Sequence, residues 1–137
     1  MTTLLEEYYR NDLHNPGYIE RKTTLTDESA QIIGISHSGK TSLIKHYLLD
    51  QKKSSYLYLN CADIRIDISE INATLKPFCY EHKISILALD NYRNEINLFP
   101  MSQILISGEI SFNLELPIIR LNLLDFEEFL AFEQRFD

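Results

Sequence analysis

The feature that most constrains the fold is an eight-residue segment that matches the pattern G-x-x-x-x-G-K-[ST] without departure. It reads Gly34-Ile35-Ser36-His37-Ser38-Gly39-Lys40-Thr41. The stretch 30–35 is short, apolar and rich in β-branched residues, which predicts a buried strand, and apolar residues recur at helical spacing from about Lys40 to Leu49. The pattern fixes only four positions, and the surrounding strand and helix distinguish it from a chance match. We therefore expect a strand-loop-helix unit.

The residue types in this loop are suited to binding phosphate. Glycines let the backbone curl so that consecutive N–H groups point inward, and the helix that follows adds the positive end of its dipole. The Lys40 ammonium is expected to reach the β- and γ-phosphates of a nucleotide, and the Thr41 hydroxyl to help hold Mg²⁺. The predicted nucleotide-binding residues are Gly34, Ser36, His37, Ser38, Gly39, Lys40, Thr41 and Ser42.

The rest of the chain alternates between predicted strands and helices. Further strands are predicted at 55–61, 84–90, 103–108 and 118–123, and the run at 84–90 is nearly continuous in apolar residues, as in a central parallel strand. Helices are predicted near residues 4–9, at 71–79, where Pro77 predicts either a kink or a restart, and from Asp125 onward. This alternation predicts an α/β domain with a mostly parallel five-stranded sheet.

Asp90 is the last residue of the predicted strand at 84–90, about fifty residues after the loop. An aspartate at the carboxyl end of a strand in this layout binds Mg²⁺, so the predicted metal-binding residues are Thr41 and Asp90. Related ATP-hydrolysing enzymes usually carry a glutamate next, where this chain has Asn91. An amide orients water but does not accept its proton. Hydrolysis is therefore expected to be slow, to use another carboxylate such as Glu95, or to be replaced by a nucleotide-dependent switch.

Ser107 is the third candidate catalytic residue, with Asp90 and Asn91. It ends the strand at 103–108, where a polar residue contacts the γ-phosphate or orients water; a plain strand-end turn is the alternative interpretation. Glu109 is a further candidate for the same site. Three arginines are candidates to act on a neighbouring subunit's site, although each also fits an ordinary surface position: Arg93, Arg120 and Arg135.

Composition narrows the class of protein. The chain has 137 residues, about one domain, and a formal net charge of −7, which disfavours nonspecific nucleic-acid binding. No apolar run is long enough to cross a membrane and the first residues do not form a signal peptide, so a cytoplasmic location is expected. Two cysteines are too few for a disulfide framework, and Cys61 and Cys79 are predicted to be reduced core residues. Tyr56 and Tyr58 are likewise predicted to be core residues rather than base-stacking platforms.

Four stretches in order resemble the AAA+ superfamily, and more closely the archaeal-type ATPases with an AAA core followed by other domains. They are 32–45, 86–90, 104–108 and 120–130, the last running from a strand into Phe-Glu-Glu-Phe-Leu. The resemblance implies a three-layer αβα P-loop NTPase core with strand order 5-1-4-3-2. It also implies ATP and Mg²⁺ as cofactors, and often oligomers whose sites lie at subunit interfaces.

The chain departs from this family in three respects. Asn91 stands where the family has its usual glutamate, the segment 109–117 contains no arginine, and the helical lid that would follow the fifth strand is absent. We therefore expect a single domain, with an N-terminal helix and lead-in over 1–29 and an AAA+-like core over 30–137, truncated before a lid.

The leading hypothesis is an ATP-binding ATPase core with weak or assembly-dependent hydrolysis. Its expected partners are nucleotide and either further copies of the chain or a protein client, with no membrane and no specific nucleic acid. The alternative is a noncatalytic module in which nucleotide binding orders a surface for a partner. GTP is disfavoured because no N-K-x-D motif is present, and a small-molecule kinase because no arginine-rich lid is found.

Overall fold

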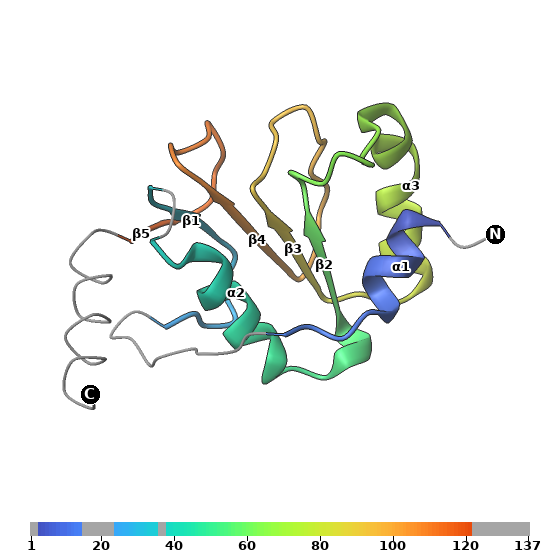
Figure 1. The fold of residues 1–137 in the computed structure, drawn as a ribbon, viewed down its shortest axis with the longest axis horizontal. Coiled ribbons are helices and arrows are strands. Elements are labelled where there is room, and N and C mark those ends of the chain that lie inside the picture. The colour runs from blue at the N-terminus through green and yellow to red at the C-terminus, as the bar shows by residue number, and fades with distance from the viewer. Residues whose placement is uncertain (1–2, 15–23, 36–37, 122–137) are drawn as a thin grey trace.

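The computed structural model describes residues 3–14, 24–35 and 38–121. Within them, the structure has three α-helices, one short 3-10 helix and five strands; helices precede or separate the first three strands, and β3, β4 and β5 follow one another through loops (Figure 1). In chain order these are α1 (Leu4–Arg10), β1 (Ala30–Ile33), α2 (Lys40–Leu49), η1 (Lys53–Ser55), β2 (Tyr56–Asn60), α3 (Ile68–Glu81), β3 (Ile86–Asp90), β4 (Gln103–Gly108) and β5 (Ile118–Arg120).

The five strands form one sheet in the order β2-β3-β4-β1-β5, and every neighbouring pair is parallel. The predicted α/β class is therefore confirmed, and the sheet is entirely rather than mostly parallel. Parallel neighbours need crossover connections, which bring helices onto the faces of the sheet. The carboxyl ends of all five strands lie along one edge, where the loop after β1 also begins (Figure 1).

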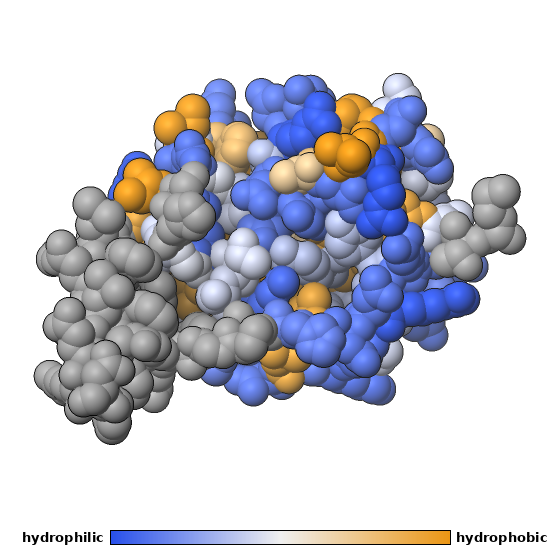
Figure 2. Space-filling model, viewed as in Figure 1, coloured by the Kyte–Doolittle hydropathy of each residue, from blue (hydrophilic) through white to orange (hydrophobic). Residues whose placement is uncertain are grey.

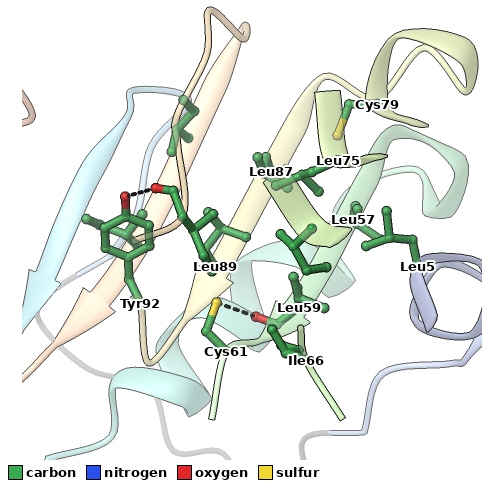
Figure 3. Close-up of a cluster of buried hydrophobic side chains, with 14 of the residues drawn as sticks. Leu5, Leu57, Leu59, Cys61, Ile66, Leu75, Cys79, Leu87, Leu89 and Tyr92 are labelled. Carbon is green, nitrogen blue, oxygen red and sulfur yellow. Dashed lines mark hydrogen bonds between the residues drawn. The ribbon is translucent and has the colours of Figure 1, made fainter. Parts of the chain in front are cut away.

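Two apolar clusters cover the two faces of the sheet. Because side chains alternate along a strand, neighbouring residues of β2, β3 and β4 contribute to opposite clusters. Under α1 and α3 the buried residues include Leu5, Leu57, Leu59, Ile71, Leu75, Cys79, Leu87, Leu89 and Ile106 (Figure 3). Under α2 they include Ile32, Leu43, Ile44, Leu48, Tyr56, Tyr58, Ile86, Ala88 and Leu105. Helices thus pack on both faces of the sheet.

Helix α3 runs from Ile68 to Glu81 without interruption, although Pro77 lies inside it. Of the two alternatives predicted at Pro77, a kink or a restart, the restart is therefore excluded. Asp67 caps the helix by accepting a hydrogen bond from the Glu70 amide, and Ile71, Leu75 and Cys79 bury one stripe at helical spacing. The packing of this stripe offsets the backbone hydrogen bond that a proline cannot donate.

Strand boundaries differ from the predictions by one or two residues. β1 ends at Ile33, not residue 35, because the Ile35 carbonyl accepts a turn hydrogen bond from the Ser38 amide at 3.1 Å. β2 and β3 are likewise shorter than predicted, whereas α2 and β4 have the predicted bounds. The predicted end of the fifth strand at residue 123 and the helix from Asp125 lie outside the described residues.

The described surface is mostly polar on the side that α2 covers, and its hydrophobic residues form separate patches (Figure 2). Both cysteines are buried and free, as predicted. Within the described ranges, none of the helices has the length and apolar character needed to cross a membrane.

Candidate functional site

The loop after β1 depends on two glycines at its ends. A Cβ atom on Gly34 would lie 2.5 Å from Ser38 Oγ and 2.7 Å from the Leu121 carbonyl oxygen, so the loop closes against this position only if no side chain is present. Gly39 has φ 92°, a left-handed conformation, and is the N-cap of α2. Ser36 and His37 lie outside the described residues.

Lys40 begins α2 and folds back over the loop. Its side chain is only 8% exposed, and its ammonium donates to the carbonyl oxygens of Gly34 and Ile35, the second at 3.0 Å. Carbonyl dipoles compensate a buried positive charge only in part. An anion in the loop would therefore be favoured by a charge that the fold already holds there. Thr41 and Ser42 continue the first turn of α2.

Asp90, at the end of β3, is the centre of a cluster of hydroxyl groups. Its carboxylate is 1% exposed and accepts three hydrogen bonds from three different elements. Thr41 Oγ1 of α2 donates to Oδ2 at 2.7 Å, Tyr58 of β2 donates to the same oxygen at 2.6 Å, and Ser107 of β4 donates to Oδ1 at 2.5 Å. Such charge-assisted bonds are what allow a carboxylate to remain buried.

Strand register explains why these groups meet. Leu89 pairs with Ile106, so the residues that follow them, Asp90 and Ser107, end adjacent strands side by side. Tyr58 pairs with Ala88, two residues before Asp90 on the same face of the sheet. An aromatic side chain reaches a diagonal neighbour at this spacing, and the small Ala88 leaves room for the ring to do so.

Asn91 follows Asp90 with φ 54°, in the left-handed region that asparagine tolerates better than most residues. Its backbone amide donates to Ser107 Oγ at 2.7 Å, and its side-chain amide donates to Asn60 Oδ1 at 3.1 Å. The Ser107 hydroxyl therefore bridges Asp90 and Asn91. Asn60 ends β2, so the carboxyl ends of β2, β3 and β4 each contribute a polar side chain to this edge.

Burial and the Asp90 charge change the acidity of the groups around it. Burial first, and then the nearby Asp90 carboxylate, raises the pKa of Tyr58 far above its ordinary value. The same two causes raise the pKa of the Cys61 thiol to about 12. Tyr58 is therefore a neutral hydrogen-bond donor at any physiological pH.

Three of the remaining candidates, Arg93, Glu95 and Arg120, lie away from the Asp90 carboxylate in the described part of the chain. The Arg93 guanidinium lies 3.7 Å from the Glu95 carboxylate, and both residues line a hollow of about 670 Å³ between the loops after β3 and β4. The Asp90 side chain is not part of that lining. Arg120 is exposed at the end of β5, and Arg135 lies outside the described residues.

Two residues of this cluster, Tyr58 and Asn60, were not among the predicted site residues. Tyr58 was predicted only as a core residue, which its 7% exposure confirms, but its hydroxyl also contacts Asp90. Side chains alternate along β2 and β3, so Tyr58 shares a face with Ala88 and Asp90 once the two strands are paired. This alternation would have indicated the contact if the pairing of the strands had been known.

Comparisons of the chain with family models, with curated proteins and with solved structures found no match. A fold by itself does not define a function, because unrelated activities share the same architectures. The function must therefore be argued from the chemistry of the loop and of the Asp90 cluster.

Proposed function

We propose that this chain is the nucleotide-binding core of an AAA+-type ATPase, which binds Mg²⁺-ATP through the loop from Gly34 to Thr41. The observation that carries the proposal is the 2.7 Å hydrogen bond from Thr41 Oγ1 to Asp90 Oδ2. It joins the last residue of the loop motif to a buried carboxylate 49 positions later in the chain. The strand order supports the proposal as well, since read from β5 it is 5-1-4-3-2.

The residues of the loop fit a phosphate group. Glycine at position 34 lets a phosphate approach the backbone closely. A Cβ atom there would lie 2.5 Å from Ser38 Oγ, so the loop has no room for a side chain at this position. The first turn of a helix has backbone N–H groups without an acceptor inside the helix, and α2 adds the positive end of its dipole. Lys40 adds a buried cation, whose present partners are backbone carbonyls that a phosphate would replace.

The donor set at Asp90 fits Mg²⁺. This ion prefers oxygen ligands, keeps several waters and is typically held by one or two carboxylates together with phosphates. Thr41 supplies a hydroxyl oxygen and Asp90 a carboxylate. The described residues hold no group of three or more His, Cys, Asp or Glu side chains suited to a metal, so the proposed site needs the phosphates and water as further ligands. When bound, the ion neutralises charge on the phosphate oxygens. Thr41 and Asp90 would hold the ion, and Lys40 would bind the phosphates.

Asn91 favours a second candidate, a noncatalytic module in which nucleotide binding orders a surface for a partner. The residue after Asp90 carries no carboxylate, and its amide is held by Asn60. Asn91 can orient water but does not accept its proton, so slow hydrolysis is expected under both candidates. Turnover by this chain near the enzyme median of ~10 s⁻¹ would contradict that expectation.

The test is calorimetric titration of a nonhydrolysable ATP analogue with Mg²⁺ into Lys40→Ala. Loss of a charge-assisted contact to phosphate is expected to weaken binding by at least about tenfold. The control is Lys52→Ala, which removes the same charge from an exposed position. Undiminished affinity in Lys40→Ala would overturn the assignment of the loop, as would an equal loss in both variants.

A further inference from the structure

Tyr58 contacts the predicted metal-binding carboxylate although nothing in the loop motif requires a tyrosine there. Its side chain is 7% exposed and its hydroxyl donates to Asp90 Oδ2 at 2.6 Å. Lys45 of α2 places its ammonium 5.4 Å from the centre of the Tyr58 ring. The ring is therefore held by α2, the same helix that carries Thr41, through a cation-π contact.

The hydrogen bonds of Asp90 leave one acceptor position for a ligand. An ionised carboxylate has about four lone-pair positions. Within the described part of the chain, Thr41 and Tyr58 occupy both positions on Oδ2, and Ser107 occupies one on Oδ1. The fourth position, on Oδ1, is the one that a cation or a cation-bound water can use.

The covalent structure of the Asp90 side chain does not fix the orientation of its carboxylate plane. Rotation of an aspartate carboxylate about its last bond is soft, so hydrogen bonds must hold the plane. Tyr58 and Ser107 do so from the two strands that flank β3, each on a different oxygen. Without the phenol, Oδ2 keeps only the hydrogen bond from Thr41, and the contact that holds the carboxylate plane from the β2 side is lost, so the plane is less firmly fixed.

We propose that Tyr58 is a positioning residue that holds the Asp90 carboxylate in the orientation used for the divalent cation of a bound nucleotide. This inference rests on the proposed nucleotide-binding function. Tyr58 acts through Asp90 and does not touch the nucleotide. Its effect is therefore confined to the contribution that the cation makes to nucleotide affinity.

A merely structural tyrosine would behave differently. Tyr56 lies on the same strand and face, is also 7% exposed, and pairs with Ile86, one side-chain repeat further from Asp90. Tyr56→Phe is therefore a matched control for Tyr58→Phe, because both changes remove one phenol oxygen and keep the ring. Thermal unfolding of the two variants checks that each is folded at the temperature of the assay.

The experiment measures the affinity of a nonhydrolysable ATP analogue with Mg²⁺ and with excess EDTA for the wild type and both variants. The ratio of the two affinities is the cation's contribution. Tyr58→Phe is expected to lower that ratio by about three- to tenfold, the range for one lost hydrogen bond, with binding in EDTA unchanged. Tyr56→Phe is expected to leave both affinities as in the wild type.

Three outcomes would overturn the inference. A ratio in Tyr58→Phe equal to that of Tyr56→Phe would show that the phenol does not act on the cation. Equal weakening with Mg²⁺ and with EDTA would show a structural role only. A wild-type chain that binds the analogue under neither condition would overturn the proposed function itself, which separates that failure from the other two.

Discussion

The two faces of the sheet differ most at the carboxyl ends of β3 and β4. Leu89 and Ile106 face α1 and α3 and are fully buried among aliphatic side chains. The next residues, Asp90 and Ser107, are also buried but contact each other and the hydroxyl of Thr41 in α2. Adjacent residues of one strand thus enter an apolar cluster on one side and a hydrogen-bonded polar cluster on the other.

This difference separates stability from binding. The face of the sheet under α1 and α3, called the apolar face below, stabilises the fold mainly by burying side chains. Each large aliphatic group contributes about 1.5–3 kcal/mol to the free energy of unfolding. The polar cluster contributes little net stability, because the free energy of its hydrogen bonds is largely offset by desolvation of the carboxylate. Buried polar groups that add little stability are expected where a ligand must be held.

The largest expected effect is the loss of stability caused by a substitution on the apolar face. Leu89→Ala should lower the free energy of unfolding by about 2–5 kcal/mol, because it leaves a cavity among fully buried residues. Urea denaturation followed by circular dichroism measures the change. Its neighbour Asp90→Asn, a change of nearly equal volume, should cost less, about 1–3 kcal/mol, because the new NH2 group cannot accept the hydroxyl hydrogen bonds that one carboxylate oxygen accepts.

Nucleotide affinity should show the opposite order in this pair. Folded Leu89→Ala is expected to bind the ATP analogue as the wild type does, whereas Asp90→Asn should lose most of the increase in affinity that Mg²⁺ provides. If both variants lost stability and affinity to the same extent, the distinction between the two faces would be wrong.

A smaller effect is expected on the proposed ATP hydrolysis when Asn91, beside the polar cluster, is replaced. Asn91→Glu should raise a low rate of ATP hydrolysis by at least about tenfold, since a carboxylate in this position can accept a proton from water. The gain is limited because glutamate is less stable than asparagine at φ 54° and loses the contact with Asn60. Phosphate release under steady-state conditions measures the rate.

Glu95→Gln is the control for that experiment. The Glu95 carboxylate is paired with Arg93 and lines the hollow between the loops after β3 and β4, which does not include Asp90. Removal of this carboxylate should therefore leave the rate of hydrolysis unchanged. A large loss of hydrolysis in Glu95→Gln would instead identify Glu95 as the substitute carboxylate.

The smallest effect concerns the two cysteines of the apolar face. Burial raises the pKa of the Cys61 and Cys79 thiols to about 12, so both stay protonated at pH 8 and should react slowly with iodoacetamide. In urea their pKa returns to about 8.5 and alkylation should accelerate. Because the native thiols retain protons that the unfolded chain releases, stability should fall as the pH rises above about 8.5. Rapid alkylation of the native chain would show that this face opens readily.

Much of the fold could be predicted from the sequence because its signals are local. The helix from Lys40 to Leu49 and the strand from Gln103 to Gly108 have the predicted bounds, since their apolar periodicity and flanking glycines act over a few residues. At Pro77 the sequence left a kink and a restart open, because the local rule gives no weight to the buried stripe of Ile71, Leu75 and Cys79.

The site was predictable only where a residue's role depends on its own neighbours in the chain. The loop motif and Asp90 were predicted from the sequence, and their contact through Thr41 is a feature of the structure. Tyr58 was predicted as a core residue and no more, because its hydroxyl is directed by pairing between β2 and β3, which lie some thirty positions apart.

The sequence by itself determined which segments are strands and helices, and that a glycine-bounded loop joins the first strand to its helix. These properties follow from side-chain periodicity and from the backbone freedom of glycine, both of which are local. Only the tertiary structure decided which side chains share the Asp90 carboxylate. That choice depends on strand order and register, which are set by packing across the whole sheet, and a shift of one residue would turn Tyr58 to the opposite face.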